Sequence, residues 1–199
     1  MKILIPTAAI ILWLLSVISV SAQQGDPPSA VPDYSPNSWS EYSYPVDNIK
    51  FRFPVKPVIE ESSLEAGGKK LDTRLYKRGS FIKFSLAVTD QGTRKMEENI
   101  KKSDDFLDIL VEASVGTNKL VKKEHKSVDG VPGMFFVFET ASGVLVRSKL
   151  FVLGTKIYVA GTEVKKGERH GFNWENDFEV PAMAFLDSIH IIDPKKDGN

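Results

Sequence analysis

The sequence predicts an α+β fold, in which an antiparallel β-sheet is packed with helices. Three observations lead to this prediction. Residues 39–192 contain many short runs that alternate apolar and polar side chains, as half-buried strands do. Glycines separate several of these runs at places where hairpins need a turn. Two further segments show the apolar spacing of amphipathic helices.

The first strands are predicted at the start of this region. The run "WSEYSY" alternates weakly, and "IKFRFP" alternates clearly, with Ile49, Phe51 and Phe53 on one face. Pro54 and Pro57 then restrict continuation of the strand.

A hairpin is predicted next, from "KKLDTRLYKRG" and "SFIKFSLAVTD", with its turn at Arg78-Gly79-Ser80. The expected inward residues are Leu71, Thr73 and Leu75 on the first strand, and Ile82, Phe84, Leu86 and Val88 on the second.

The stretch from 129 to 161, "DGVPGMFFVFETASGVLVRSKLFVLGTKIYVAG", predicts a three-stranded antiparallel meander. Gly143 and Gly154 stand at its expected turns. Met134, Phe136 and Phe138 fall on one face of its first strand. The preceding run "KLVKKEHKSV" is polar and is expected to form a strand at the edge of the sheet.

Helices are predicted over 94–115 and 180–189. The apolar face of the first comprises Met96, Ile100, Leu107, Leu110 and Val111. Ser103 is a candidate cap of a second helix inside that span, and Gly116 is its expected end. Pro181 suits the first position of the later helix. The apolar face of that helix comprises Ala182, Phe185, Leu186 and Ile189.

The N-terminus has the pattern of an export signal. Lys2 precedes an apolar run from Ile3 to about Val20, and small residues lead to an expected cleavage after Ala22. The alternative is an uncleaved N-terminal membrane anchor, since the run is just long enough to span a bilayer. We therefore expect a signal peptide at 1–22, a proline-rich linker at 23–38, the folded domain at 39–192 and a disordered tail at 193–199.

Composition narrows the classes of function. Lys and Arg number 26 and Asp and Glu number 26, so no basic excess indicates binding to nucleic acid or to an anionic membrane. The chain has no cysteine, which excludes disulfides and a lipid-attached cysteine. These features fit a secreted or periplasmic protein that is stabilised by core packing alone, with no membrane span after signal cleavage.

The order of these motifs resembles the PsbP family and its bacterial DcrB-like relatives. The matching pieces are "WSEYSYPVDNIKFRFPVKP", "VDGVPGMFFVFETASGVLVRSKLFVLGTKIYVAG" and "FLDSIHI", and together they cover about 39–192. In the last piece Ile189 stands where an aromatic residue is usual. The resemblance implies an α/β/α sandwich of the PsbP type and a binding or assembly role without a shared catalytic centre. Fold alone does not carry function over.

Motifs for catalysis, cofactors or metals are lacking in the sequence. His125, His170 and His190 are far apart and lack metal-ligand spacing. Neither a G-x-S-x-G elbow nor a phosphate-binding glycine loop occurs. We therefore predict no catalytic residue, no cofactor and no metal.

Four carboxylates lie on the first predicted helix: Asp104, Asp105, Asp108 and Glu112. Asp104, Asp108 and Glu112 share one face, because they are four residues apart. This face is either a weak cation site or a solvated surface that complements the helix dipole.

The segment 165–179, "KKGERHGFNWENDFE", is the candidate binding surface. Aromatic residues and arginine concentrate binding energy at interfaces, and here they occur among glycines and acids. The candidate contact residues are Arg169, His170, Phe172 and Trp174. The alternative is that Phe172 and Trp174 fold back onto the core.

The function predicted from the sequence is an exported, non-catalytic binding or assembly module of the bacterial envelope. Its partner would be a protein or another envelope component. The alternative is a hydrolase whose site the sequence does not reveal.

Overall fold

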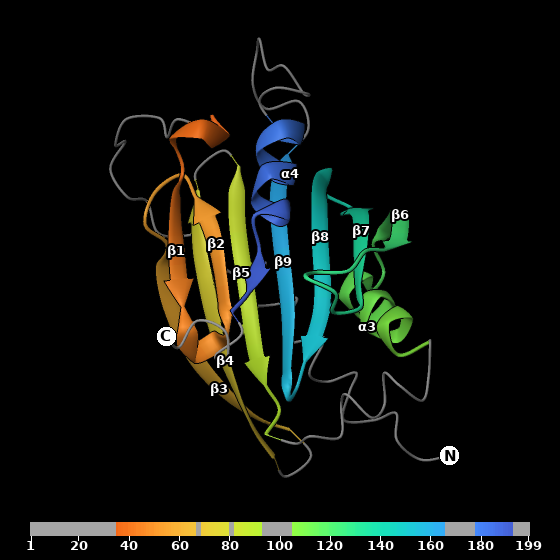
Figure 1. Cartoon of the computed structure of the whole chain (residues 1–199). Coiled ribbons are helices and arrows are strands. Elements are labelled where there is room, and N and C mark those ends of the chain that lie inside the picture. The colour runs from red at the N-terminus through yellow and green to blue at the C-terminus, as the bar shows by residue number, and fades with distance from the viewer. Residues whose placement is uncertain (1–34, 67–68, 80–81, 93–104, 166–177, 193–199) are drawn as a thin grey trace.

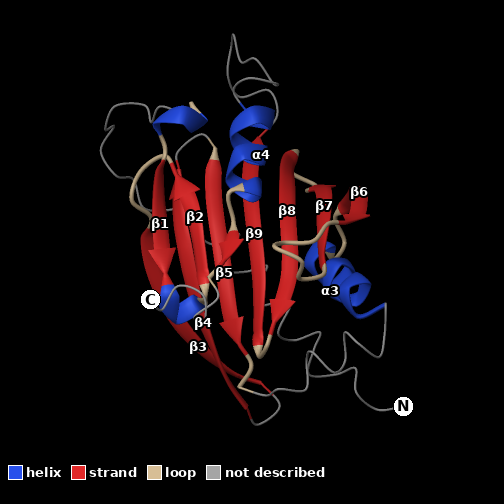
Figure 2. Cartoon of the chain, viewed as in Figure 1, coloured by secondary structure: helices blue, strands red, loops and turns tan. Residues whose placement is uncertain are grey.

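The computed structural model describes residues 35–66, 69–79, 82–92, 105–165 and 178–192. Two antiparallel sheets, two α-helices and two short 3₁₀ turns make up this part of the chain (Figures 1 and 2). The strands are β1 (Ser40–Tyr44), β2 (Ile49–Phe53), β3 (Val58–Ala66), β4 (Lys69–Gly79), β5 (Lys83–Asp90), β6 (Lys119–His125), β7 (Gly133–Glu139), β8 (Val144–Leu153), β9 (Lys156–Lys165) and β10 (His190–Ile191). The helices are α3 (Asp105–Val115) and α4 (Val180–Asp187), and the 3₁₀ turns are η1 (Pro36–Ser38) and η2 (Pro45–Asp47).

The larger sheet has seven strands in the order β3-β4-β5-β9-β8-β7-β6. Every neighbouring pair is antiparallel. The predicted hairpin is confirmed as β4–β5, the predicted meander as β7–β8–β9, and the polar edge strand as β6. Gly143 and Gly154 make the two meander turns with φ of +77° and +61°, a conformation that glycine adopts without steric cost.

The smaller sheet has three strands in the order β1-β2-β10. Its last strand comes from the far end of the chain, because His190 pairs with Lys50 and Ile191 with Ile49. Figure 1 shows β1 and β2 in front of β3 and β4. Ile49, Phe51 and Phe53 are fully buried, as the alternation of "IKFRFP" predicts.

Apolar side chains cover both faces of the larger sheet, so the molecule has two hydrophobic cores. The first core lies between the sheet and the layer formed by the smaller sheet and α4. Phe51, Phe53 and Phe84 each meet Phe185 edge to face in it, and the centroids of Phe53 and Phe185 are 5.1 Å apart. The second core lies on the opposite face, under α3.

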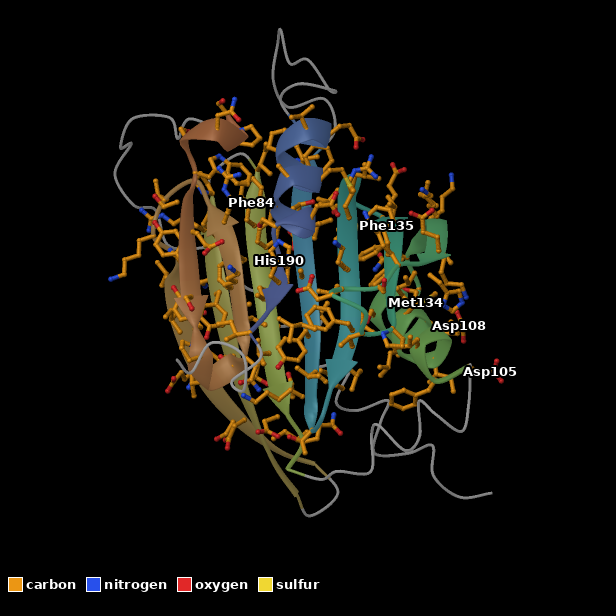
Figure 3. All side chains as sticks on the ribbon, in the orientation of Figure 1. Phe84, Asp105, Asp108, Met134, Phe135 and His190 are labelled. Carbon is orange, nitrogen blue, oxygen red and sulfur yellow. The ribbon has the colours of Figure 1, made fainter. Side chains whose placement is uncertain are left out.

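Strand β7 contributes to both cores in turn. Met134, Phe136 and Phe138 face α3, as predicted, whereas Phe135 and Val137 face the first core. Figure 3 labels Met134 and Phe135. The sequence analysis assigned no core position to Phe135, which is buried as well.

The described helices agree with the predictions in their apolar faces. In α3 the buried residues include Leu107, Leu110 and Val111, and the helix ends at Val115 with Gly116 donating its N–H to the Glu112 carbonyl at 2.8 Å. Residues 94–104, including Met96, Ile100 and Ser103, lie outside the described residues. Helix α4 has a proline in its first turn and ends at Asp187, two residues earlier than predicted.

The α+β class holds, but the layers differ from an α/β/α sandwich. Helix α3 covers one face of the sheet beside β7 and β8. The other face is covered by the three-stranded sheet together with α4. The fold is thus dominated by strands, because the N-terminal strands and β10 form a sheet layer where a helical layer was expected.

Neither α-helix in the described ranges has both the length and the apolar character needed to cross a bilayer. The predicted signal peptide at 1–22, most of the linker at 23–38, and the tail at 193–199 lie outside those ranges. Pro36–Ser38, at the end of the predicted linker, form η1, and Arg52 donates to the Pro36 carbonyl at 2.6 Å.

Candidate functional site

A group of ionisable side chains surrounds the buried carboxylate of Asp47. This residue ends the turn η2, which begins at Pro45 and is followed by Asn48 in the left-handed conformation. Asparagine tolerates that conformation better than most residues do. The turn directs Asp47 away from solvent, and only 4% of the residue is exposed.

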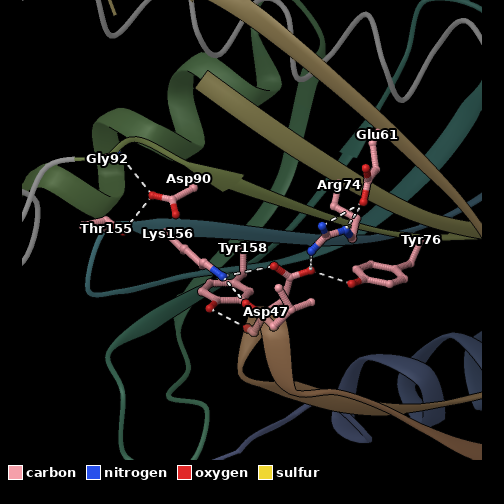
Figure 4. A network of polar contacts seen from close by, with 10 residues as sticks. Asp47, Glu61, Arg74, Tyr76, Asp90, Gly92, Thr155, Lys156 and Tyr158 are labelled. Atoms are coloured by element: carbon pink, nitrogen blue, oxygen red, sulfur yellow. Dashed lines mark hydrogen bonds and ion pairs between the residues drawn. The ribbon is translucent and has the colours of Figure 1, made fainter. Parts of the chain in front are cut away.

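Strands β4 and β9 of the larger sheet supply the partners of Asp47 (Figure 4). Its Oδ2 accepts hydrogen bonds from Arg74 Nη1 at 2.8 Å and from the Tyr76 hydroxyl at 2.5 Å. Its Oδ1 accepts one from Lys156 Nζ at 3.1 Å, and the Tyr158 hydroxyl donates to its backbone carbonyl at 2.8 Å. We call these five residues the Asp47 cluster.

The charges of the Asp47 cluster stabilise one another. Burial raises the pKa of Asp47, but hydrogen bonds from Tyr76, Arg74 and Lys156 outweigh burial and hold this pKa below its ordinary value. Burial, together with the hydrogen bond to Asp47, raises the pKa of Tyr76 far above its ordinary value. Burial likewise raises the pKa of Tyr158. At neutral pH the cluster therefore contains a firmly ionised carboxylate and two firmly protonated phenols.

Such an arrangement is suited to holding secondary-structure elements together. A general acid or base works best with a pKa near the operating pH, and the shifts in this cluster move away from neutrality. The cluster connects η2, β4 and β9, and Arg74 also donates to Glu61 on β3 at 2.8 Å. It thus ties the N-terminal turn to three strands of the larger sheet.

A second buried ionic group connects β8 to the end of α4. Lys149 Nζ donates to the Leu186 carbonyl at 2.6 Å and to Asp187 Oδ1 at 3.0 Å, and Lys126 reaches the same oxygen at 2.8 Å. Burial lowers the pKa of Lys149, and the Asp187 carboxylate opposes this. The lysine satisfies a carbonyl at the end of α4 that has no partner within the helix.

Glu163 on β9 is the described carboxyl group with a raised pKa, and burial is the cause. Ser85 and Ser148 lie in one cross-strand row with Gly161, two positions from Glu163 on the same strand face. Ser85 Oγ donates to the Gly161 carbonyl at 3.4 Å rather than to a carboxylate. A nucleophile activated by a base requires a hydrogen bond between the two, and this row provides none among the described contacts.

The candidate binding residues Arg169, His170, Phe172 and Trp174 lie outside the described residues. At the C-terminal end of that segment, residues 178 and 179 are described. Phe178 is fully buried, and the Arg147 guanidinium lies 5.6 Å from the centre of its ring. Arg147 also forms an ion pair with Glu179. This anchor precedes α4 directly.

The three described carboxylates of α3 have different surroundings. Asp108 forms an ion pair with Lys123 on β6 at 2.8 Å, which raises the pKa of Lys123. Asp105 and Glu112 are exposed, and Asp104 is outside the described residues. Figure 3 labels Asp105 and Asp108 on α3. The described residues contain no group of three or more histidine and carboxylate side chains that would hold a metal ion.

The two described histidines, His125 and His190, have different surroundings. His125 is exposed on β6, and His170 is outside the described residues. His190 Nδ1 lies 3.1 Å from Asp129 Oδ1, and Asp129 also accepts the Ile191 N–H at 2.7 Å. This contact fastens β10 to the turn at 128–131.

Sequence reasoning missed the Asp47 cluster and the Lys149 group. Two signals were present: Tyr76 falls out of phase with Leu71, Thr73 and Leu75, and a lysine interrupts the apolar run of β8. Each indicates a second buried face of the sheet. The partners of Asp47 are 27 to 111 residues away, so the sequence pattern could not bring them together.

Comparison with known proteins finds likenesses among solved structures. The solution structure of cyanobacterial PsbP (CyanoP) from Synechocystis sp. PCC 6803 is similar with a TM-score of 0.48 and 10% sequence identity. The match covers 85% of this chain and 98% of that chain. No family model matches the chain, and no curated protein was found to be similar to it.

Proposed function

We propose that this protein is an exported, non-catalytic binding or assembly module of the bacterial envelope. The observation that carries the proposal is the Asp47 cluster. Its carboxylate, guanidinium, ammonium and phenol groups bind one another and hold the two sheets together, so they are occupied with structure rather than directed at a substrate. The resemblance of the sequence motifs to the PsbP family is in keeping with this role.

The binding surface proposed from the sequence is the segment between β9 and α4. The observed anchor supports this choice, because buried Phe178 and the Arg147–Glu179 ion pair fix the C-terminal end of the segment beside α4. A segment attached to a rigid scaffold can present aromatic and cationic side chains to a partner. The proposed contact residues are Arg169, His170, Phe172 and Trp174.

Trp174→Ala is expected to abolish capture of the partner and to leave the melting temperature nearly unchanged. The reason is that a Trp174 side chain that contacts the partner contributes binding energy, and its truncation opens no cavity in the core. The measurement is chemical cross-linking of the tagged protein in envelope extract, followed by mass spectrometry, with melting curves of the same samples. Val180→Ala is the control, because Val180 is 47% exposed at the start of α4.

If Trp174 instead packs on the core, Trp174→Ala will lower the free energy of unfolding by several kcal/mol, as loss of a buried tryptophan does. A large drop in melting temperature would therefore contradict the proposed binding surface. An unchanged set of cross-linked proteins in the Trp174→Ala sample would contradict it as well.

Export has its own test. The protein recovered from envelope fractions or medium is expected to begin at Gln23, because small residues precede the predicted cleavage point. Intact-mass and N-terminal peptide spectra measure this directly. Recovery of chains that retain Met1 in the membrane fraction would show that the first residues act as an anchor.

A further inference from the structure

The two outer strands of the larger sheet differ in how well they are protected from pairing with another strand. Each outer strand, β3 and β6, has one neighbour among the described strands. Exposed aliphatic side chains occur on both, namely Val58 and Ile59 on β3 and Leu120 and Val121 on β6. An unprotected edge of this kind is a template for pairing with another chain.

Strand β6 carries the usual protection. Its sequence "KLVKKEH" has three lysines within seven residues, and its pairing with β7 shifts register between Leu120 and Lys122. Lysines and bulges are the features with which natural sheets prevent edge pairing. We therefore do not assign a partner to this edge.

Strand β3 lacks both of these features, and its charged residues are three glutamates. It pairs with β4 over nine consecutive residues without a register shift, and its sequence "VIEESSLEA" contains neither lysine nor proline. The side chains of residues 58–63 are exposed on both faces of the strand. An edge that is long, regular and accessible is suited to accept another strand.

We propose that β3 pairs antiparallel with β3 of a second copy of this chain, around a two-fold axis at Ser62. This pairing would join the seven-stranded sheets of the two copies into one continuous sheet. An isologous pair of this kind closes on itself and leaves only the protected β6 edges outside. The proposal is independent of the partner that the envelope module binds.

The order of residues in β3 selects this register. Opposite residues of an antiparallel pair share a face, so the register changes only in steps of two. Pairing around Ser62 overlaps all nine positions and places Glu60 opposite position 64, Glu61 opposite Ser63, and position 65 opposite Ile59. No glutamate then faces a glutamate directly.

The adjacent registers are unfavourable. Pairing around Glu61 would place Glu61 opposite its own copy, and pairing around Ser63 would place it opposite position 65, which is also a glutamate. Like charges directly opposite one another destabilise a strand pair. Within each copy, Lys77 and Arg74 neutralise Glu60 and Glu61 at distances of 2.6 and 2.8 Å, which allows two acidic strands to approach.

Single cysteines test the register, because the chain has no cysteine of its own. Directly opposite residues of an antiparallel pair have Cα atoms about 4.5–5.5 Å apart, which is within the range of a disulfide. Ser62→Cys is therefore expected to form a cross-linked dimer under mild oxidation. Ser63→Cys is the matched control, because two copies of residue 63 would be roughly 8 Å apart and would cross-link at least tenfold more slowly.

Charge variants test the pairing without a covalent bond. The wild-type protein is expected to show a concentration-dependent dimer in analytical ultracentrifugation. Ser62→Lys and Ser62→Glu are each expected to be monomeric, and an equimolar mixture of the two is expected to restore the dimer. A wild-type protein that stays monomeric at millimolar concentration would overturn the proposal, as would equal cross-linking of Ser62→Cys and Ser63→Cys. A dimer that persists in both charge variants would also overturn it.

Discussion

Phe136→Ala is expected to lower the free energy of unfolding by about 3–5 kcal/mol, as truncations of buried phenylalanines do. The Phe136 side chain is fully buried in the core under α3, and its ring stacks on Phe138 at a centroid distance of 6.2 Å. The variant leaves a cavity between β7 and α3. Because β7 is paired with a strand on each side, the backbone cannot move in to fill this cavity. Equilibrium unfolding in urea, monitored by tryptophan fluorescence and by circular dichroism, measures the change.

Leu120→Ala is the matched control for Phe136→Ala. Leu120 lies on β6 opposite Phe138 but is 41% exposed, so its truncation is expected to change stability by less than about 0.5 kcal/mol. A loss below about 1 kcal/mol in Phe136→Ala would mean that the face of β7 has been assigned wrongly.

Asp47→Ala is expected to destabilise the protein at pH 7 by about 3–5 kcal/mol. Removing one member of a buried ionic group leaves the others without compensation. Arg74 and Lys156 would lose their common anion, and Tyr76 would lose its acceptor. Unfolding by urea at pH 7, compared with the wild-type protein, measures the loss.

The effect of Asp47→Ala should depend on pH in a defined direction. The pKa of Asp47 in the folded protein is lowered from its ordinary value of 3.8. The stability that this carboxylate contributes is therefore fully present above about that pH, and it is lost as the pH falls through 3.8 and then through the lower folded value. The difference between wild type and Asp47→Ala should stay constant from pH 7 to 5 and shrink in more acidic solution.

Glu61→Ala separates the buried part of this network from its exposed part. Glu61 also binds Arg74, but 68% of its side chain is exposed. Its truncation should cost at most about 1 kcal/mol, as loss of an exposed ion pair does. If Glu61→Ala and Asp47→Ala had equal effects, or if the Asp47→Ala difference were the same at pH 3 and pH 7, the buried carboxylate would not be the stabilising group.

Local alternation was sufficient to predict most strands of the larger sheet. In β7, β8 and β9 the turn glycines and the apolar phase agree, so position and pairing followed from neighbouring residues alone. Helix α3 was also predicted from neighbouring residues, because Leu107, Leu110 and Val111 recur at helical spacing.

Strand β3 was not predicted, because its described side chains are exposed and carry no periodic signal. The strand exists through its hydrogen bonds with β4, which a pattern of burial cannot reveal. Strands β1 and β2 of the smaller sheet were predicted, but the separate sheet that they form was not, for another reason. Its third strand has two residues and pairs with a segment about 140 positions earlier, beyond the reach of local spacing.

The candidate binding segment remains a prediction from residue types. The Asp47 cluster illustrates the opposite case, in which the site is evident only in three dimensions. Asp47 stands in a short "PVD" turn with no motif around it, and its partners come from alternating positions of β4 and β9. Their convergence depends on the packing of one sheet on the other.

The pairing of β2 with β10 also determines when the protein can finish folding. Residues 49–50 must wait for residues 190–191, so the smaller sheet cannot be completed before these two distant segments meet. Contacts between such distant positions slow folding, since a long loop must close before they form. Helix α4, which precedes β10 directly, brings Phe185 against Phe51 and Phe53, so these two buried rings are fully covered only after the C-terminal segment has docked.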